Sequence, residues 1–379
     1  MKILIFGGAF NPVHNEHLNI VRSAIKKVGA DKVIIVPTGT SPHKSGKLTV
    51  ADEIRIKACE IAFSSLKNVE VSTYEIESGG VSYSYLTCRH FKNLYPDDEL
   101  FFLVGADMLK GFPTWKNPQE ILSLATLVAC RRQGINGFDD DAKMVEETFN
   151  TKVLIAEYSG LNVSSTKIRT LLSLGESASE YLNKDVHDYL KSANAYRIDN
   201  LIKAKDLLTE KRWWHSVRVA VMCAQNCSRA NLDEMQAITM GALHDVAKYL
   251  KPDDEQLKNY SVPSGVPNPV LHQYTGAYVA RNTFGITDEI VLSAIECHTS
   301  AKPYMTDADV LLYLADMLEE DRNFTGIEQL RILFYKDLTK CITRALEMQV
   351  DYLIYRGAPV YQKTLDAYKF FKDKQKNGQ

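Results

Sequence analysis

Residues 7–18 read Gly7-Gly8-Ala9-Phe10-Asn11-Pro12-Val13-His14-Asn15-Glu16-His17-Leu18, and the architecture of the first half follows from this stretch. The apolar run before it, residues 3–6, predicts a buried strand. The helical pattern after it carries Leu18 and Val21 on its apolar face and stops at Gly29. His14 and His17 are therefore expected where a strand end turns into a helix N-terminus. Backbone N–H groups and the helix dipole favour an anion there, so we interpret the stretch as a nucleotide-phosphate site.

Length and composition favour two domains and exclude several kinds of protein. A chain of 379 residues, 45% of them apolar, is long enough to form two packed cores. Its net charge of −2 offers no basic surplus for nucleic acid or for an anionic membrane surface. We find no signal-peptide pattern and no apolar run of membrane-spanning length. None of the seven cysteines forms a C-x-x-C pair, so we expect reduced thiols and a cytoplasmic location.

Strand and helix patterns alternate through the first half. Six strands are predicted from the apolar runs at residues 3–6, 33–36, 69–74, 100–104, 126–130 and 153–157. Helical patterns lie between them, notably at residues 50–66, 83–94 and about 140–149. This alternation predicts a Rossmann-like α/β fold, a doubly wound parallel sheet with helices on both faces. Such a sheet binds ligands at the carboxyl ends of its strands.

Polar side chains follow the predicted strand ends. His14 and His17 follow the first strand, residues 37–44 the second, Asp107 the fourth and Arg132 the fifth. The chain lacks a G-x-G-x-x-G motif after the first strand and has no P-loop, which disfavours a dehydrogenase and a P-loop enzyme. Loops that carry His, Lys, Arg and Ser are suited to phosphate recognition without a covalent nucleophile.

The first half, from residue 1 to about residue 196, resembles the bacterial nicotinate-nucleotide adenylyltransferases, which are nucleotidylyltransferases with an H-x-G-H motif. The motifs that carry this resemblance occur in the order found in the family. They are Gly7-Gly8-x-Phe10-x-Pro12-x-His14-x-x-His17-Leu18, Pro37-x-x-x-x-Pro42-His43-Lys44, Gly80-x-Ser82-Tyr83, Gly105-Ala106-Asp107 with Trp115, Arg132-x-Gly134 and Ser164-Ser165-Thr166-x-Ile168-Arg169.

The resemblance implies transfer of adenylate from ATP to nicotinate mononucleotide, with Mg²⁺ as cofactor. It implies that His14, His17 and Arg169 are catalytic and stabilise phosphate charge during in-line attack. The implied ATP-binding residues are Gly7, Gly8, Phe10, His14, His17, Gly105, Asp107, Ser164, Ser165, Thr166 and Arg169. The implied mononucleotide-binding residues are Lys44, Ser82, Tyr83, Trp115 and Arg132.

Two positions of the first half, Glu16 and Trp115, are open to two interpretations, and Asn11 departs from the family pattern. Glu16 stands where the family motif has glycine, which lets a nucleotide approach the backbone closely. Its carboxylate either crowds or repels ATP, or it points away along the helix. Asn11 stands where aspartate is usual. Trp115 either contacts the nicotinate ring or packs in the core.

The second half reads as almost entirely helical and gathers histidines and aspartates. Its apolar-periodic segments, at residues 213–223, 238–250, 270–280, 290–298 and 310–318, carry His215, His244, Asp245, His272, His298 and Asp316. Such ligands spread over several helices are what a buried metal centre in a helical bundle requires. Six ligands exceed the needs of one ion, which favours two metals that share Asp245.

This half, from about residue 199 to residue 371, resembles the HD-domain phosphohydrolases, and in particular the symmetrical diadenosine-tetraphosphate hydrolases. The resemblance rests on Arg212-x-x-His215, Leu243-His244-Asp245-x-x-Lys248, Leu271-His272 with Gly276-Ala277, His298-Thr299, and Ala315-Asp316 with Arg322.

The resemblance implies two iron ions or other divalent metals, which would generate the nucleophile and neutralise phosphate charge. One metal would be held by His215, His244, Asp245 and Asp316, and the other by His272 and His298 with Asp245 as a bridge. Asp245 and Lys248 are implied as catalytic residues. Lys248 and Arg322 are candidate polyphosphate contacts or, alternatively, members of structural ion pairs.

We therefore predict a bifunctional enzyme with a nucleotidylyltransferase domain at residues 1–196 and an all-α HD domain at residues 197–379. Its expected partners are small nucleotides, namely ATP, nicotinate mononucleotide and diadenosine tetraphosphate, with no nucleic acid and no membrane. Three alternatives stay open. One half is a regulatory module that binds nucleotide, the transferase uses another phosphate acceptor, or the second half is a general nucleotide phosphatase.

Overall fold

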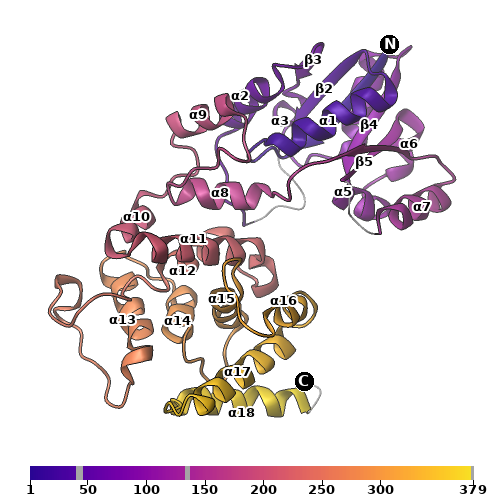
Figure 1. Cartoon of the computed structure of the whole chain (residues 1–379). Coiled ribbons are helices and arrows are strands. Elements are labelled where there is room, and N and C mark those ends of the chain that lie inside the picture. The colour runs from indigo at the N-terminus through magenta and orange to yellow at the C-terminus, as the bar shows by residue number, and fades with distance from the viewer. Residues whose placement is uncertain (40–45, 133–136, 377–379) are drawn as a thin grey trace. The chain divides into compact units, whose positions relative to one another are not determined.

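The first half contains a six-stranded parallel sheet with the strand order β3-β2-β1-β4-β5-β6 (Figure 1). The computed structural model describes residues 1–39, 46–132 and 137–376. The strands are β1 (Lys2–Gly8), β2 (Lys32–Pro37), β3 (Val69–Val71), β4 (Glu99–Gly105), β5 (Thr126–Arg132) and β6 (Leu154–Tyr158). The chain moves from the centre to one edge and then from the centre to the other, which confirms the predicted doubly wound α/β fold.

Helices connect these strands. They are α1 (Asn15–Val28), α2 (Asp52–Phe63), α3 (Tyr74–Glu77), α4 (Ser84–Leu94), α5 (Ala106–Gly111), α6 (Pro118–Leu124), α7 (Phe138–Phe149), α8 (Ser165–Ser173) and α9 (Lys184–Ser192), with a short 3-10 turn η1 (Phe112–Thr114). The third strand is shorter than predicted, because it ends at Val71 and Tyr74 already begins α3. There the Tyr74 N–H donates to the Ser72 hydroxyl (3.3 Å), so a turn replaces the expected strand end.

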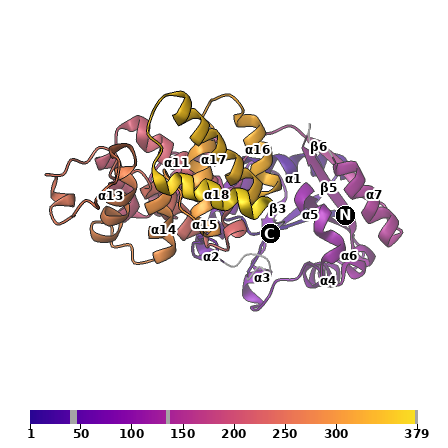
Figure 2. The ribbon, with the colours of Figure 1, turned by 90° about the horizontal axis from the view of Figure 1, so that it is seen from below.

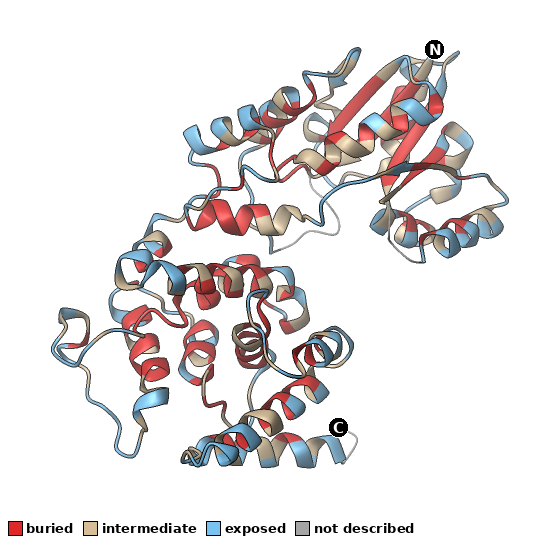
Figure 3. Cartoon of the chain, in the orientation of Figure 1, coloured by how far each residue is buried: buried red, intermediate tan, exposed pale blue. Residues whose placement is uncertain are grey.

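The strands form the core of this half because both faces of the sheet are covered. Ile3, Leu4 and Ile5 of β1 are completely buried, as is Ile34 of the neighbouring β2. Figure 3 shows the strands in the colour of buried residues. A parallel sheet covered on both sides selects continuous apolar runs, which is why the sequence pattern located the strands.

Helix α1 begins and ends where its sequence predicts. His14 occupies the N-cap in an extended conformation, and its backbone N–H donates to Nδ1 of His17 (3.1 Å). Gly29 follows the last turn with φ 67° and donates to the Ile25 carbonyl (2.8 Å). This left-handed conformation favours glycine, so the helix stops here. Both histidines are thereby held in the first turn beside the end of β1.

The chain divides into two compact units. The first comprises Met1–Ser45, Thr49–Leu172 and Ser177–Tyr196, and the second comprises Gly46–Leu48, Ser173–Glu176 and Arg197–Gln379. That residues 1–196 and 197–379 form separate domains stays a prediction. In the parts of the chain that the structure describes, no helix has the length and apolar character needed to cross a membrane.

The second half is built of helices. They are α10 (Asp199–Ile202), α11 (Glu210–Gln225), α12 (Glu234–Leu243), α13 (Asn268–Asn282), α14 (Glu289–Cys297), α15 (Asp307–Leu318), α16 (Ile327–Lys336), α17 (Leu338–Tyr355) and α18 (Gln362–Lys376). Three short 3-10 turns join them, η2 (Lys203–Leu207), η3 (Cys227–Ala230) and η4 (Glu255–Leu257). Figures 1 and 2 show α17 and α18 side by side, where Tyr368 donates to Glu347 (3.0 Å). No strand lies among the described residues of this half, in line with the predicted all-α architecture.

One predicted helix of this half is too long. The apolar pattern at residues 238–250 predicts a continuous helix, but α12 ends at Leu243. Beyond it the Val246 N–H donates to the Leu243 carbonyl and the Lys248 N–H to the Asp245 carbonyl, three residues back instead of four. The tighter turns place His244 and Asp245 just past the helix end, where both side chains reach the centre of the bundle.

Candidate functional sites

The end of β1 and the start of α1 place the two histidines of the first half against each other. The rings of His14 and His17 lie 3.8 Å apart between centroids, and the Phe10 ring packs edge-on against His17 at 5.1 Å. Burial lowers the pKa of His14 to about 4, so its ring is neutral at physiological pH. Nδ1 of His14 is buried and has no hydrogen-bond partner among the described residues. Two imidazole rings at a helix N-terminus can donate hydrogen bonds to a phosphate group.

A cavity of about 370 Å³ lies at the carboxyl ends of β1 and β4. Six residues predicted to bind ATP or the mononucleotide line it, namely Gly7, Gly8, Ser82, Tyr83, Gly105 and Trp115. Trp115 also packs against Phe112, with ring centroids 5.3 Å apart. The two interpretations of this tryptophan are therefore compatible, because one face of the ring packs while the side chain lines the cavity.

Sequence reasoning missed one acidic group in this cavity. Glu75 of α3 lines it and is buried, and burial raises the pKa of its carboxyl group. The Thr87 hydroxyl donates to Glu75 Oε1 (2.6 Å). Glu75 directly follows the third predicted strand, residues 69–74, and gave no sequence signal, because its position depends on the unexpected turn into α3.

Arg169 and Ser165 of α8 contact the loop between β1 and α1, which precedes the two histidines. Arg169 is 2% exposed, and its guanidinium donates to the Asn11 carbonyl and to the Thr166 hydroxyl (2.9 Å). The Ser165 hydroxyl donates to the Pro12 carbonyl (3.3 Å). These bonds tie the start of α8 to residues 11 and 12, so the two predicted phosphate-binding segments meet.

Asn11 has a structural partner where the sequence departs from the family pattern. The Tyr196 hydroxyl donates to Oδ1 of Asn11 (2.7 Å), and both residues are buried. An amide oxygen accepts this bond as a carboxylate would, so the change from the usual aspartate leaves the contact in place.

Glu16 points toward the loop after β6. Its Oε1 accepts from the Leu161 N–H (3.2 Å) and from Asn19 Nδ2 (3.2 Å), while Arg132 donates to the Leu161 carbonyl (3.0 Å). Glu16 therefore binds the backbone N–H of Leu161, and Arg132 binds the backbone carbonyl of the same residue. Burial and then the Glu16 charge raise the pKa of the Tyr158 hydroxyl to about 12. The Arg132 charge works in the opposite direction, and the Asp107 charge adds to the increase.

One predicted contact of the first half, Lys44, lies outside the described residues together with His43. Their roles stay predictions from the sequence. The remaining predicted residues of this half lie at the carboxyl ends of β1, β4 and β5 or in the segments that follow them, between α3 and α4, or at the start of α8.

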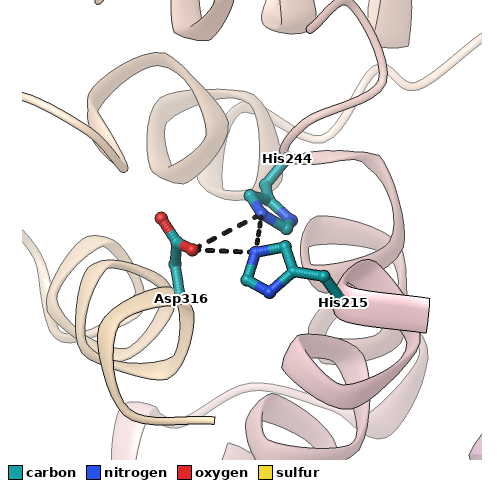
Figure 4. A group of neighbouring side chains, drawn as sticks. All are labelled: His215, His244 and Asp316. Atoms are coloured by element: carbon teal, nitrogen blue, oxygen red, sulfur yellow. Dashed lines mark hydrogen bonds and ion pairs between the residues drawn. The ribbon is translucent and has the colours of Figure 1, made fainter. Parts of the chain in front are cut away.

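The second half brings His215, His244 and Asp316 together from three helical segments (Figure 4). His215 Nε2 lies 2.9 Å from Asp316 Oδ1 and 3.3 Å from His244 Nε2. Residues from α11, the end of α12 and α15 therefore present nitrogen and carboxylate oxygen to a common point, as Figure 4 shows. This donor set suits a first-row divalent metal.

A second group, His244, Asp245 and His298, adjoins the first and shares His244 with it. Asp245 Oδ2 lies 3.4 Å from His244 Nε2, and its Oδ1 lies 3.5 Å from His298 Nε2. His272 Nε2 lies 3.3 Å from the same Oδ1. Asp245 Oδ2 therefore faces His244 and, at 4.0 Å, His215. Its Oδ1 faces His272 and His298, and a carboxylate between two pairs of histidines is the arrangement expected of a bridging ligand.

The buried atoms at this point need a cation. Asp245 Oδ1 and His298 Nε2 are both buried and neither has a hydrogen-bond partner among the described residues. A buried carboxylate is costly unless positive charge and hydrogen bonds balance it, and the Lys248 ammonium, at 3.6 Å from this oxygen, makes no hydrogen bond to it. Burial favours a neutral Asp245 carboxyl, yet His244 and His298 outweigh this and hold its pKa well below the usual range. The residues present therefore fit a divalent metal.

In three of the candidate ligand histidines, the Nδ1 atom is held by a group that sequence reasoning missed. His244 Nδ1 bonds to the Gly241 carbonyl and His298 Nδ1 to the Ile295 carbonyl, both at 2.8 Å. His215 Nδ1 lies 3.1 Å from Glu319 Oε1. These contacts direct each Nε2 toward the candidate metal centre. In metal-binding histidines the ring nitrogen that does not bind the metal usually makes a hydrogen bond of this kind.

Arg218 also contacts Glu319, on the carboxylate oxygen that does not face His215. Arg218 Nε donates to Glu319 Oε2 (2.7 Å). Burial works against ionisation, but His215 and Arg218 lower the pKa of Glu319 to about 2. Its position three residues after Asp316 was the available signal, because that spacing puts both carboxylates on one face of a helix end.

Three cations surround the candidate metal centre. Arg212 donates to Asp245 Oδ2 (2.8 Å), Arg322 to Asp316 Oδ1 (2.6 Å), and Lys248 Nζ lies 2.9 Å from His272 Nε2. Each is partly exposed and contacts a candidate metal ligand. Such groups can turn from these carboxylates to the oxygens of an incoming phosphate.

Two family models match the chain. A cytidylyltransferase-like model matches residues 5–171, and an HD-domain model matches residues 212–321. The fold and the two candidate sites thus define a two-part nucleotide enzyme, with a nucleotidylyltransferase-type half and an HD-type half.

Curated relatives combine the same two parts. A probable nicotinate-nucleotide adenylyltransferase/Ap4A hydrolase of Mycoplasma genitalium is 34% identical over 85% of this chain and 88% of its own. A protein of the same name from Mycoplasma pneumoniae is 31% identical over 84% of this chain and 89% of its own. The chain belongs to this nicotinate-nucleotide adenylyltransferase/Ap4A hydrolase family. A probable nicotinate-nucleotide adenylyltransferase of Clostridium novyi is 35% identical over 51% of this chain and 98% of its own.

Proposed function

We propose that the first half transfers the adenylyl group of ATP to nicotinate mononucleotide. The phosphate oxygen of the mononucleotide attacks the α-phosphorus of ATP, the bond to the β-phosphate breaks, and deamido-NAD and pyrophosphate leave. The observation that carries this proposal is the pair His14–His17 at the α1 N-terminus, on the same sheet edge as the cavity lined by Ser82, Tyr83 and Trp115. The names of the curated relatives support it.

In this proposal the phosphates of ATP lie over the start of α1 and the start of α8. His14 and His17 donate to the phosphate oxygens, with Ser164, Ser165 and Thr166 at the second helix start. Arg169 acts by holding residues 11 and 12 in place, because its guanidinium already bonds to the Asn11 carbonyl and to Thr166. Mg²⁺ accompanies the ATP phosphates, and catalysis is positioning and charge stabilisation.

We propose that the second half hydrolyses diadenosine tetraphosphate symmetrically, adding one water across the central phosphoanhydride to give two ADP. His215, His244, Asp245, His272, His298 and Asp316 would hold two divalent ions, iron or another first-row metal. The bound ions would activate water as Lewis acids and neutralise phosphate charge. Lys248, Arg212 and Arg322 would bind the polyphosphate, and Glu319 would orient His215.

The transferase proposal is tested by the choice of acceptor. Purified protein is incubated with ATP, Mg²⁺ and one mononucleotide at a time, and pyrophosphate release is measured. The highest kcat/KM is expected with nicotinate mononucleotide. Higher kcat/KM with another phosphate acceptor would overturn the choice of substrate. ATP binding without turnover of any acceptor would show a regulatory nucleotide module instead.

The hydrolase proposal is tested by its products. Metal-loaded protein is incubated with diadenosine tetraphosphate, and the nucleotides are separated by chromatography. ADP alone is expected. Equal amounts of ATP and AMP would show asymmetric cleavage and refute the proposal, and faster release of inorganic phosphate from mononucleotides would show a general phosphatase.

A further inference from the structure

Two cavities adjoin the candidate metal centre, and they share no lining residue. The larger, about 790 Å³, includes the ligands His298 and Asp316 in its wall. The smaller, about 260 Å³, includes the ligand His272 together with Lys248. A linear substrate whose phosphates lie at the metal ligands therefore has a separate cavity available for each of its ends.

The larger cavity has the character of a nucleoside site. Tyr352 and Met348 of α17, Met317 of α15 and Phe324 supply apolar and aromatic walls, and Asp351 supplies a carboxylate that can accept from ribose hydroxyls or an amino group. Its volume lies in the range of pockets that bind small organic ligands, about 300–1,000 Å³. The Tyr352 side chain is largely exposed, so its ring is available for a base to stack on.

The smaller cavity is lined by the segment between α12 and α13. Leu257, Tyr260, Val262 and Pro269 form an apolar wall, and Val262 is half exposed. The Tyr260 ring packs against Tyr278, with centroids 5.0 Å apart, which fixes its orientation. The space is enough for a planar base but smaller than the cavity on the other side.

The charges between the cavities match a chain of phosphates. Arg322 lies in the wall of the larger cavity and Lys248 in the wall of the smaller. Lys248 Nζ lies 3.6 Å from Asp245 Oδ1, and Arg322 donates to Asp316, so each of these cations contacts a candidate metal ligand. A polyphosphate across the candidate metals would meet a basic side chain toward each end.

We propose that the two cavities bind the two nucleosides of one dinucleoside polyphosphate. The larger cavity takes one whole nucleoside, and the smaller takes the base of the other. This inference rests on the hydrolase activity proposed above and adds the reason for a dinucleoside substrate. A mononucleotide would fill only the larger cavity.

The test compares two substrates that differ by one nucleoside, diadenosine tetraphosphate and adenosine 5′-tetraphosphate, with metal-loaded full-length protein. Tyr352→Ala should raise KM for both substrates, because both place an adenosine in the larger cavity. Tyr260→Ala should raise KM for diadenosine tetraphosphate only. Loss of a base–aromatic stack costs about 1–3 kcal/mol, so we expect KM to rise roughly 5- to 150-fold.

Matched controls separate cavity contacts from packing. Tyr355→Ala removes a more exposed tyrosine of the same helix outside the cavity, and Tyr335→Ala removes a tyrosine of α16 that packs on Phe334 and lines neither cavity. Both should change KM less than 2-fold. Equal effects of Tyr260→Ala on the two substrates, no effect on either, or an equal effect of Tyr335→Ala would overturn the proposal of two nucleoside sites. Wild-type protein that yields no ADP from diadenosine tetraphosphate would instead refute the hydrolase activity itself.

Discussion

The carboxylate of Glu16 occupies the space that a side chain on Gly160 would need. A Cβ placed on Gly160 would lie 2.0 Å from Glu16 Oε2, closer than any two such atoms can approach. The backbone of Gly160 is not in the left-handed region, so a larger residue here conflicts only with space, and the three nearest atoms all belong to the Glu16 carboxyl group. Glu16 stands where the H-x-G-H motif has a glycine, in the first turn of α1. Gly160, in the loop after β6, leaves the space that the Glu16 carboxylate occupies.

This relationship predicts that the two positions are coupled. Gly160→Ala alone should destabilise the protein by about 1–3 kcal/mol, the usual cost of overpacking. In a Glu16→Gly background the same substitution should cost much less, because the clashing carboxylate is gone. Thermal unfolding of the wild type, both single variants and the double variant measures the coupling. Gly111→Ala, whose Cβ would meet only ordinary contacts, is the control. Additive effects of the two substitutions would contradict the coupling.

Glu319 should affect metal affinity without touching the metal. Glu319→Ala removes the acceptor for His215 Nδ1, so metal affinity should fall about 10- to 100-fold. Glu319→Gln keeps a carbonyl oxygen at this place and should recover most of the affinity. Calorimetric titration with Mn²⁺ measures both. Glu328→Ala, which removes an exposed carboxylate of α16, should leave the affinity unchanged. An unchanged affinity in Glu319→Ala would show that the contact does not position the histidine.

The His14 ring should stay neutral well below physiological pH. Its pKa of about 4 in the folded protein lies below the ordinary value of about 6.5, because burial disfavours the charged ring. The unfolded chain therefore binds more protons between these values, and His14 lowers the free energy of unfolding as pH falls from about 6.5 to about 4. An NMR titration of the ring resonances measures this pKa. A midpoint near 6.5 would contradict the buried, neutral histidine.

Metal removal should destabilise the helical half. Metal that binds the folded protein at about 100 times its dissociation constant adds about 2.7 kcal/mol to the free energy of unfolding. Scanning calorimetry before and after chelation should therefore show a lower melting temperature for one transition. The variant Asp245→Asn, which removes the shared carboxylate charge, should lose this metal-dependent shift. An equal shift in that variant would place the stabilising metal elsewhere.

The strands and most helices could be predicted because burial on both faces of the sheet selects apolar runs. The end of α1 was predictable for a different reason. Gly29 adopts the left-handed conformation that commonly ends a helix and that favours glycine. The end of α12 was not predictable, because its apolar pattern continues through turns beyond Leu243. Periodicity records which residues are buried, and it does not distinguish a helix from the tighter turns that follow it.

The candidate sites were predictable as sets of residues and much less as geometry. His215, His244 and Asp316 are far apart in the sequence, yet the structure brings them together. The direction of Glu16 depends on a loop more than 140 residues further along the chain, and the contact of Glu319 with His215 depends on how two helices pack. Such long-range contacts have no periodic signature, so only the structure reveals them.

The central claim is that one chain carries two separate reaction centres. The most direct test assays wild type, His17→Asn and Asp245→Asn for pyrophosphate release from ATP with nicotinate mononucleotide, and for ADP release from diadenosine tetraphosphate. We predict that His17→Asn lowers the first reaction about 100-fold or more and keeps the second, and that Asp245→Asn does the reverse. Loss of both reactions in either variant, or the absence of either reaction in the wild type, would contradict the claim.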